Sequence, residues 1–353
     1  PGDRFMFLGS TGWIVWNLMI GSLLAGATVV LSDGNPTTPN DDALWDFIDQ
    51  YQVSIFGCGA AFLTRSMKDG VSPKKGRQFE KLRAINSTGS PLPLDAYAWV
   101  YENVKNDLWL ASISGGTDIA SGFVACAPIL PVNAGEIQCR ELGVAAHAFN
   151  EQGQKVIAEV GELVITEPMP SMPVFFWNDE SGARYHDSYF DVFAGYWRHG
   201  DWIEFSERGT AVIYGRSDST INRFGIRMGT AEIYRVVEEL DAVKDSLVVD
   251  LEYLGRPSFM PLFVTLAEGL ALTGELTAQI KNAIKTKASA RHVPNVVVQV
   301  AEIPRTLTGK KMEVPVRKLL LGADAAKVAS PDAMANPSSI DFFIQFREQV
   351  PQA

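Results

Sequence analysis

Cysteine and long apolar runs are both scarce in this sequence. Its 353 residues include 3 cysteines, and these are widely spaced and odd in number: Cys58, Cys126 and Cys139. Such a set does not indicate a disulfide framework. No stretch approaches the roughly 18 uninterrupted apolar residues that a membrane-spanning helix needs, and the first residues lack the basic segment and apolar run of a signal peptide. We therefore expect a soluble, cytoplasmic protein without a membrane partner.

Positive charge is also in short supply. The formal net charge is −10 and the pI is ≈ 5.0. A protein that binds nucleic acid or an anionic membrane usually presents a basic surface, so we expect no nucleic-acid partner. An anionic ligand would need a local cluster of positive side chains.

Several catalytic motifs are missing as well. The sequence has no GxxxxGK[ST] phosphate loop, no GxGxxG after a strand and no GxSxG nucleophile turn. Its 4 histidines are scattered along the chain, and no Cys/His group has the spacing of zinc ligands. These absences disfavour P-loop kinases, dinucleotide-dependent dehydrogenases, α/β-hydrolases and structural zinc domains.

The sequence does contain an alternation of apolar strands and amphipathic helices over residues 5–113. This pattern predicts an α/β fold, in which ligands bind at the loops that follow the carboxyl ends of the strands. Over residues 136–166 the pattern changes to short strands between glycine turns, which indicates a small β subdomain. From residue 216 onward, helices at 230–240, 275–290 and 314–320 and strands at 245–253, 260–267 and 295–300 predict a compact α+β domain.

Residues 323–353 form a separate last part. Residues 325–339 are rich in Ala, Ser, Pro and Asn, a composition typical of a flexible linker. The apolar residues that follow predict a short terminal helix that docks on the body of the protein: Ile340, Phe342, Phe343, Ile344 and Phe346. We therefore divide the chain after residues 215 and 322.

Four segments stand out by their order and spacing: SGGTD at 114–118, HGDW at 199–202, YGRSDSTINRFGIRMGTAEIY at 214–234 and IPRTLTGKK at 303–311. Alone, the first has the simpler explanation of a strand-to-helix turn with Asp118 as N-cap, and the second that of a hairpin turn. Together they resemble the acyl-adenylate-forming (ANL) enzymes, which include acyl-CoA synthetases, luciferases and peptide-synthetase adenylation domains. The resemblance implies that residues 1–215 are the back part of the large AMP-binding domain and residues 216–322 a mobile C-terminal domain.

The resemblance also implies ATP, Mg²⁺ and coenzyme A as ligands. Asp201 would accept hydrogen bonds from the ribose hydroxyls of ATP, with Arg216 as its partner. Asp118 would help to hold Mg²⁺ on the phosphates, although the family usually has Glu at this position. The remaining residues implied at the nucleotide are Thr117 in the catalytic turn and, against the adenine, Gly89, Ser90 and Pro91.

Lys310 resembles the catalytic lysine of the family. A lone lysine in a Gly/Thr loop is usually a solvated charge, but the family's lysine follows the glycine of this loop and meets the substrate carboxylate and the α-phosphate. A cation there offsets the charge that develops as two anions approach each other. We therefore favour Lys310 over its neighbour Lys311.

Four further positions follow from the resemblance alone. Asp218 would be the hinge about which the C-terminal domain rotates, and Gly225 would line the tunnel for the pantetheine thiol, where the missing side chain permits close approach. Arg227 would pair with phosphate through its planar fork. Lys285 would meet a phosphate of coenzyme A, although helix lysines are usually solvated.

The acyl pocket resembles that of the branch of the family that activates acetoacetate. In acetyl-CoA synthetases bulky tryptophans precede the Thr-Glu turn, whereas Ser114 and Gly115 stand here and leave room for a four-carbon 3-oxo acid. The full set implied for the pocket is Trp13, Ile14, Val15, Thr88, Ser114 and Gly115. For Ile14 and Val15 a role in the core remains an equal alternative. Acetoacetate use would place the parent protein in ketone-body and lipid metabolism.

One segment of the family is not found in this sequence, namely the Thr/Ser/Gly-rich phosphate loop that ends in Pro-Lys. We therefore expect a missing N-terminal segment of the same protein as a partner, and no adenylation by the 353-residue chain alone. Three alternatives stay open. They are a ligase for another short acid such as propionate, butyrate or hydroxybutyrate, a truncated non-catalytic nucleotide-binding remnant, and an assembly-line adenylation part.

Overall fold

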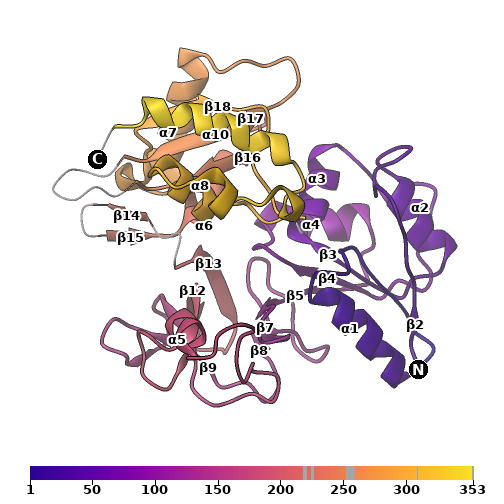
Figure 1. Cartoon of the computed structure of the whole chain (residues 1–353). Coiled ribbons are helices and arrows are strands. Elements are labelled where there is room, and N and C mark those ends of the chain that lie inside the picture. Colours follow the sequence, from indigo (N-terminus) through magenta and orange to yellow (C-terminus); the bar gives the residue numbers. More distant parts are fainter. Residues whose placement is uncertain (218–220, 224–225, 252–258, 308, 352–353) are drawn as a thin grey trace. The chain divides into compact units, whose positions relative to one another are not determined.

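The computed structural model describes residues 1–217, 221–223, 226–251, 259–307 and 309–351, without the side chains of residues 222–227. The chain divides into two compact units, Pro1–Ile213 and Tyr214–Ala353, which Figure 1 distinguishes by colour along the sequence. The division lies close to the expected break after residue 215. Among the residues described here, every helix is too short or too polar to span a membrane.

The first unit is built on a parallel five-stranded sheet with the order β2-β1-β3-β4-β5. Its strands are β1 (Arg4–Phe7), β2 (Thr28–Val29), β3 (Ile55–Gly59), β4 (Ala84–Thr88) and β5 (Trp109–Ser112). The helices between them are α1 (Val15–Ser22), η1 (Leu23–Ala25), α2 (Ala43–Gln50), α3 (Ala60–Lys68) and α4 (Leu94–Asn103). The predicted α/β fold is therefore confirmed.

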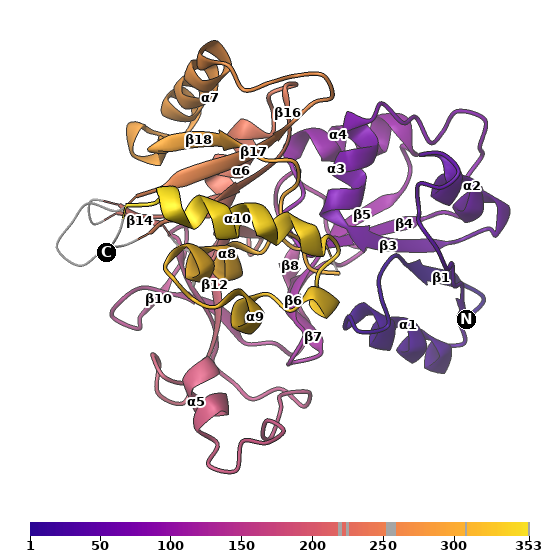
Figure 2. The same ribbon diagram turned by 45° about the horizontal axis from the view of Figure 1, so that its top comes forward.

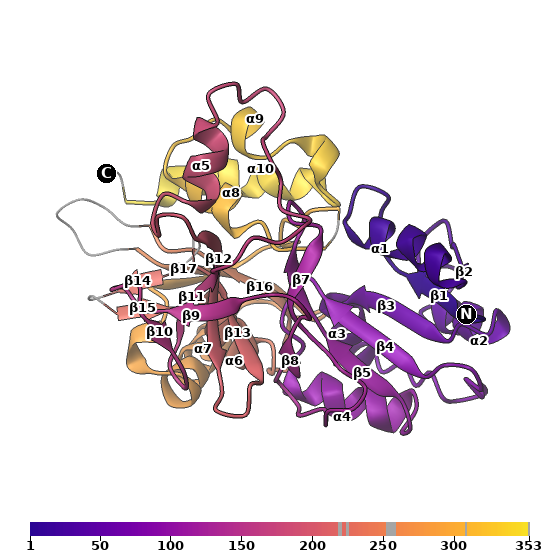
Figure 3. The same cartoon turned by 90° about the horizontal axis from the view of Figure 1, so that it is seen from below.

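Alternation along β1 explains why helices cover both faces of this sheet. Met6 belongs to the apolar cluster formed with α2, α3 and α4, whereas Phe5 and Phe7 belong to a second cluster with Trp13 and the helix α1. Successive side chains of a strand point to opposite faces, so one strand serves two cores. Figures 2 and 3 show α1 on one side of the sheet and α3 with α4 on the other.

Two antiparallel sheets complete the first unit and confirm the predicted β subdomain. One has the order β6-β7-β8 and the other β10-β9-β11-β12-β13. Their strands are β6 (Ser114–Gly116), β7 (Ser121–Ala125), β8 (Cys139–Arg140), β9 (Ala146–Phe149), β10 (Lys155–Val156), β11 (Gly161–Ile165), β12 (Trp197–Phe205) and β13 (Ala211–Arg216). The short helix α5 (Ala183–Tyr189) packs on β12 through Tyr189, whose ring stacks on that of Trp197 with centroids 3.5 Å apart.

The second unit is a three-stranded sheet between two helical layers. β16 (Val243–Val248) and β17 (Pro261–Leu266) are antiparallel, and β17 and β18 (Val296–Gln299) are parallel. Leu262 and Val264 face the cluster of α6 (Thr230–Val237) and α7 (Gly274–Lys287), while Phe263 faces that of α8 (Glu313–Leu320) and α10 (Ile340–Phe346). Figure 2 shows α7 and α10 on opposite sides of this sheet. The helices predicted at 230–240, 275–290 and 314–320 correspond to α6, α7 and α8, and the ribbon of β14 (Ile221–Arg223) and β15 (Ile226–Met228) was not predicted.

The last part of the chain differs from the flexible linker expected for residues 325–339. It forms α9 (Ala325–Val328), η3 (Pro331–Ala333) and η4 (Pro337–Ser339) before α10. Ala329 and Met334 are buried in the same apolar cluster as Phe343. Composition alone indicated a linker because the few apolar side chains that anchor this stretch are widely spaced.

Replacing Phe343 with Ala should destabilise the second unit by about 3–5 kcal/mol, the usual cost of truncating a buried Phe. Phe343 is 0% exposed and its ring lies 4.7 Å from that of Phe263. Hydrogen exchange of the β17 amides measures the unfolding free energy of this unit specifically. The matched control is Ile344→Ala, since Ile344 is 37% exposed, and equal effects of the two substitutions would contradict the packing of α10.

Candidate functional site

The carboxyl edge of the parallel sheet gathers several of the predicted site residues. Parallel strands end at the same edge, where α/β folds bind ligands. Thr88 at the end of β4 donates its hydroxyl to the carbonyl of Ile113, 2.8 Å away, which joins the loops after β4 and β5. Gly89 has a φ of 86°, which favours glycine, and a Cβ there would lie 3.7 Å from the Trp13 ring. The structure thus brings together Trp13, the Gly89-Ser90-Pro91 loop and the start of β6.

The predicted acyl-pocket residues separate into two groups. Trp13 and Val15 are buried in the cluster of Phe5 and Phe7, so for Val15 the structure gives a core position. Ile14 is half-buried and lines a pocket of ≈ 460 Å³. The other lining residues of this pocket are Phe5, Asn17, Leu18, Gly21, Ser22 and Ala120. Trp13, Val15, Thr88, Ser114 and Gly115 do not line it.

Gly115 has a structural reason to be glycine. It lies in β6 at a register shift of the β6–β7 hairpin, and a Cβ there would come within 2.2 Å of the backbone carbonyl oxygen of Ser121. Backbone cannot yield as a flexible side chain can, so no larger residue fits this local arrangement. The absence of an indole at this position therefore follows from the hairpin itself, and it carries less information about the acid than the sequence comparison implied.

Asp118 lies in the exposed turn between β6 and β7. A strand, not a helix, follows it, so the simpler interpretation of Asp118 as a helix N-cap is wrong. Its Oδ2 accepts a hydrogen bond from the hydroxyl of Tyr189, whose ring is stacked on Trp197. Tyr189 therefore orients the carboxylate. Sequence reasoning missed this residue because 71 positions separate the two partners and no local pattern joins them.

The Asp118 turn fits a magnesium ion that is coordinated mainly by substrate phosphates and water. Among the described residues, no group of three or more His, Cys, Asp and Glu side chains could hold a metal ion by itself. Mg²⁺ commonly keeps several waters and binds through one or two carboxylates together with substrate phosphates. The exposed carboxylate of Asp118 is such a donor.

Asp201 lies within β12 rather than in a hairpin turn, so the simpler interpretation of HGDW is wrong. The pairing of β11 with β12 shifts register between Glu162 and Val164, opposite this motif, and Gly200 has a φ of 88°. A bulge of this kind re-aims a side chain within a strand. Asp201 is 8% exposed, and its Oδ2 lies 3.6 Å from Nε2 of His199.

His199 joins the two parts of the site in the first unit. Its ring lies 4.4 Å from that of Phe123 in β7. A Cβ on Gly116 would come within 2.9 Å of His199 Cε1, so the glycine allows the β6–β7 hairpin to approach β12. The turn of Asp118 and the buried Asp201 are therefore linked through His199, which sequence reasoning did not single out.

The site residues predicted in the second unit are described only in part. Arg216 is exposed at the end of β13, and Lys285 is exposed on α7. Asp218 and Gly225 lie outside the described residues. Arg227 is described only by its backbone, which pairs with Asn222 across the β14–β15 ribbon. The roles of these residues stay predictions.

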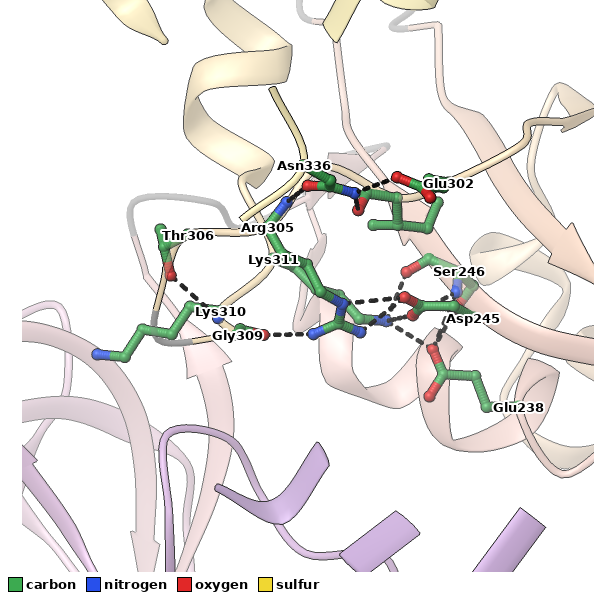
Figure 4. A network of polar contacts seen from close by, with 11 residues as sticks. Glu238, Asp245, Ser246, Glu302, Arg305, Thr306, Gly309, Lys310, Lys311 and Asn336 are labelled. Atoms are coloured by element: carbon green, nitrogen blue, oxygen red, sulfur yellow. Dashed lines mark hydrogen bonds and ion pairs between the residues drawn. The ribbon is translucent and has the colours of Figure 1, made fainter. Parts of the chain in front are cut away.

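Lys310 is carried by a small hairpin that Arg305 and Lys311 close with an antiparallel bridge. The Thr306 amide donates to the Lys310 carbonyl at 2.9 Å, and the Thr306 hydroxyl accepts from the Lys310 amide at 3.1 Å. Gly309 has a φ of 81° and permits the turn. Lys310 is exposed, and Figure 4 shows its ammonium pointing away from the polar network beside the hairpin.

Lys311 is held inside that network. Its Nζ lies 2.5 Å from Glu238 Oε1 and 3.2 Å from Asp245 Oδ1, and 3.7 Å above the Tyr234 ring. Arg305 donates two hydrogen bonds to Asp245 Oδ2, at 3.1 and 2.7 Å. Burial by itself raises the pKa of Asp245, but the adjacent Lys311 and Arg305 outweigh it and hold that pKa below its usual range. The two neighbouring lysines thus have different environments, and that of Lys311 is structural.

Comparison with known proteins adds relatives along nearly the whole chain. The AMP-binding enzyme family matches residues 1–172. The acetoacetyl-coenzyme A synthetase of Rhizobium meliloti (strain 1021) is 44% identical over 347 residues, which cover 98% of this chain and 53% of the relative. The acetoacetyl-CoA synthetase of Gallus gallus is 41% identical over 342 residues, covering 97% of this chain and 51% of the relative. The chain thus spans about half the length of the curated relatives it matches.

Solved structures are also similar to this chain along most of its length. The acetoacetyl-CoA synthetase from Streptomyces lividans has a TM-score of 0.90 and 45% sequence identity, over 99% of this chain and 53% of that one. The anthranilate CoA ligase AuaEII has a TM-score of 0.74 at 18% identity, over 88% of this chain and 58% of that one. The second likeness shows the fold alone.

Replacing Asp245 with Asn should destabilise the second unit by about 1–3 kcal/mol at neutral pH, because it leaves Lys311 and Arg305 without their shared carboxylate. The pKa of Asp245 is lower in the folded chain than in the unfolded chain. Its contribution is therefore present above the unfolded pKa, about 3.9, and is lost as the pH falls through the folded value. Urea unfolding at a series of pH values measures this.

The matched control is Asp241→Asn, because Asp241 is an exposed carboxylate just before β16 and is not part of the network of Glu238, Asp245, Arg305 and Lys311. The control should change stability little at any pH. A difference between wild type and Asp245→Asn that stays constant down to pH 3 would contradict the electrostatic explanation.

Proposed function

We propose that this chain, which belongs to the adenylate-forming enzymes, is the back part of an ATP-dependent acetoacetate–CoA ligase. The reaction joins acetoacetate and CoA to acetoacetyl-CoA through an acyl-adenylate and releases AMP and pyrophosphate. The observation that carries the proposal is the similarity along nearly the whole chain to acetoacetyl-CoA synthetases. Those relatives are about twice as long, so an upstream segment of the same polypeptide would supply the remainder of the AMP-binding domain.

In the first half-reaction a carboxylate oxygen of acetoacetate attacks the α-phosphorus of ATP, and the bond to pyrophosphate breaks. Lys310 offsets the charge that develops between the two anions. Asp201 and Arg216 hold the ribose, and the loop from Gly89 to Pro91 lies against the adenine. Asp118, with Thr117 beside it, would hold Mg²⁺ on the phosphates. When bound, the ion neutralises phosphate charge.

In the second half-reaction the thiol of CoA attacks the acyl carbon, and the bond to the AMP oxygen breaks. Asp218 is the proposed hinge for a rotation that withdraws Lys310 and presents Gly225 to the pantetheine. Arg227 and Lys285 are the proposed phosphate contacts. The exposed position of Lys285 on α7 leaves it accessible to a ligand phosphate.

A ligase for another short acid is the second candidate function, and the structure of the β6–β7 hairpin is compatible with it. Because the hairpin itself requires glycine at position 115, the room there does not distinguish acetoacetate from propionate, butyrate or hydroxybutyrate. Acetoacetate is preferred on the names of the relatives. A cytoplasmic location and a part in ketone-body metabolism belong to the same proposal, and the three free thiols agree with a reducing compartment.

The full-length protein should prefer acetoacetate over acetate, propionate, butyrate and 3-hydroxybutyrate, because its relatives are acetoacetyl-CoA synthetases. Acid-dependent release of pyrophosphate in the presence of ATP, magnesium and CoA measures this preference. A preference for another short acid would keep the adenylating chemistry and overturn the substrate. The 353-residue chain alone should release little pyrophosphate, and robust turnover by it would contradict the need for an upstream segment.

Replacing Lys310 with Ala in the full-length protein should lower the rate of adenylation by roughly 10²–10³-fold, as expected when one charge-stabilising group is removed. Thioester formation from pre-made acyl-adenylate should change little. The matched control is Lys318→Ala, because Lys318 is an exposed lysine on α8. Equal losses in the two half-reactions would count against the role of Lys310.

A further inference from the structure

The hairpin that Arg305 and Lys311 close is held along one side of its backbone by a segment close to the end of the chain. The Leu307 amide donates to the Ala333 carbonyl at 3.1 Å, and the Ala335 amide donates to the Arg305 carbonyl at 2.9 Å. Thr306 and Met334 form an antiparallel bridge. Residues 331–336, here named the brace, therefore lie alongside the hairpin and are bonded to its backbone.

The brace is itself fixed to the core of the second unit. Met334 is buried in the cluster of α8 and α10, and Ala329 just before the brace is buried there too. After the brace, α10 packs on β17 through Phe343. The hairpin is thus connected to the sheet by a segment whose two ends are both anchored.

Asn336 is the last residue of the brace, and both the oxygen and the nitrogen of its side-chain amide form hydrogen bonds at the base of the hairpin. Its Oδ1 accepts from the Arg305 amide at 3.0 Å. Its Nδ2 donates to the Ile303 carbonyl at 2.9 Å and to Glu302 Oε2 at 3.0 Å. An amide offers both an acceptor and two donors, and neither Asp nor Ala can make this set of bonds.

Arg305 holds the opposite side of the hairpin. Besides its two hydrogen bonds to Asp245, it donates to the carbonyl of Gly309, the residue before Lys310. Figure 4 shows Asn336 and the ion network meeting at Arg305, with Lys310 on the far side of the hairpin. The backbone at Arg305 is thus fixed by Asn336 while its side chain fixes Gly309.

We propose that Asn336 is a positioning residue for adenylation, which acts through Arg305 and the hairpin to hold the Lys310 ammonium where the carboxylate meets the α-phosphate. The inference rests on the proposed role of Lys310. The physical reason is that a misplacement of about 1 Å in a catalytic group can cost roughly 10²-fold in rate.

The proposal is tested in the full-length protein with Asn336→Ala, Asn336→Asp and the control Ser338→Ala, which alters an exposed residue two positions further on. Adenylation is measured by pyrophosphate exchange, and thioester formation by supplying pre-made acyl-adenylate. We expect Asn336→Ala to lower the kcat of adenylation by roughly 10–100-fold with little change in the KM for ATP. Asn336→Asp keeps the acceptor for the Arg305 amide but sets a carboxylate against the Ile303 carbonyl and Glu302, so it should lose at least as much. Thioester formation and the control should be unchanged.

A double-mutant cycle with Lys310→Ala separates positioning from a general loss of structure. If Asn336 acts through Lys310, Asn336→Ala should cause little further loss of adenylation once Lys310 is gone. A full additional loss in that background, or an equal loss in both half-reactions, would overturn the proposal. Asn336→Asp supplies the same comparison if the Ala variant does not fold.

The same cycle distinguishes the two proposals. If Lys310→Ala leaves adenylation intact, the proposed function of Lys310 fails and the role of Asn336 fails with it. If Lys310→Ala removes adenylation while Asn336→Ala and Asn336→Asp behave like Ser338→Ala, only the role of Asn336 fails.

Discussion

Both units depend on one packing constraint, which is that a strand covered on two faces must send its apolar side chains alternately into two helical layers. In the first unit β1 places Met6 in one core and Phe5 and Phe7 in the other. In the second unit β17 does the same with Phe263 and its neighbours. Helices then occupy both faces, and the strand ends and the loops between elements remain for polar chemistry. Among the predicted site residues, Thr88 at the end of β4, Asp118 in the turn after β6 and Lys310 in its hairpin occupy such positions.

Close backbone approach shapes the part of the site in the first unit. Gly115 lets β6 pair with β7, and Gly116 lets that hairpin approach His199 on β12. The bulge in β12 then orients Asp201, and Tyr189 orients Asp118 from the other side. The family resemblance suggested Gly115 as a determinant of acid specificity, but the hairpin in which it lies requires glycine there.

Opposite charges shape the part of the site in the second unit. Asp245 is shared by Arg305 and Lys311, and Glu238 takes a second contact with Lys311. Because these groups are partly buried, removing one partner should cost more than breaking a surface ion pair, since it leaves an unpaired charge. The adjacent Lys310 lies on the exposed side. The difference in burial and in partners, rather than any difference in chemistry, distinguishes the two lysines.

The sequence by itself determined the class of fold and the main helices of the second unit, because periodicity is a local property. It also drew attention to the segments around Asp118, Asp201 and Lys310, whose roles stay predictions. It was wrong about the structural setting of HGDW and of the Asp118 turn, where local patterns permit several conformations. Only the tertiary structure decided the contacts of Tyr189 with Asp118, of His199 with Gly116 and of Asn336 with Arg305. Their partners lie far apart along the chain, and nothing in the spacing of such residues records that folding will bring them together.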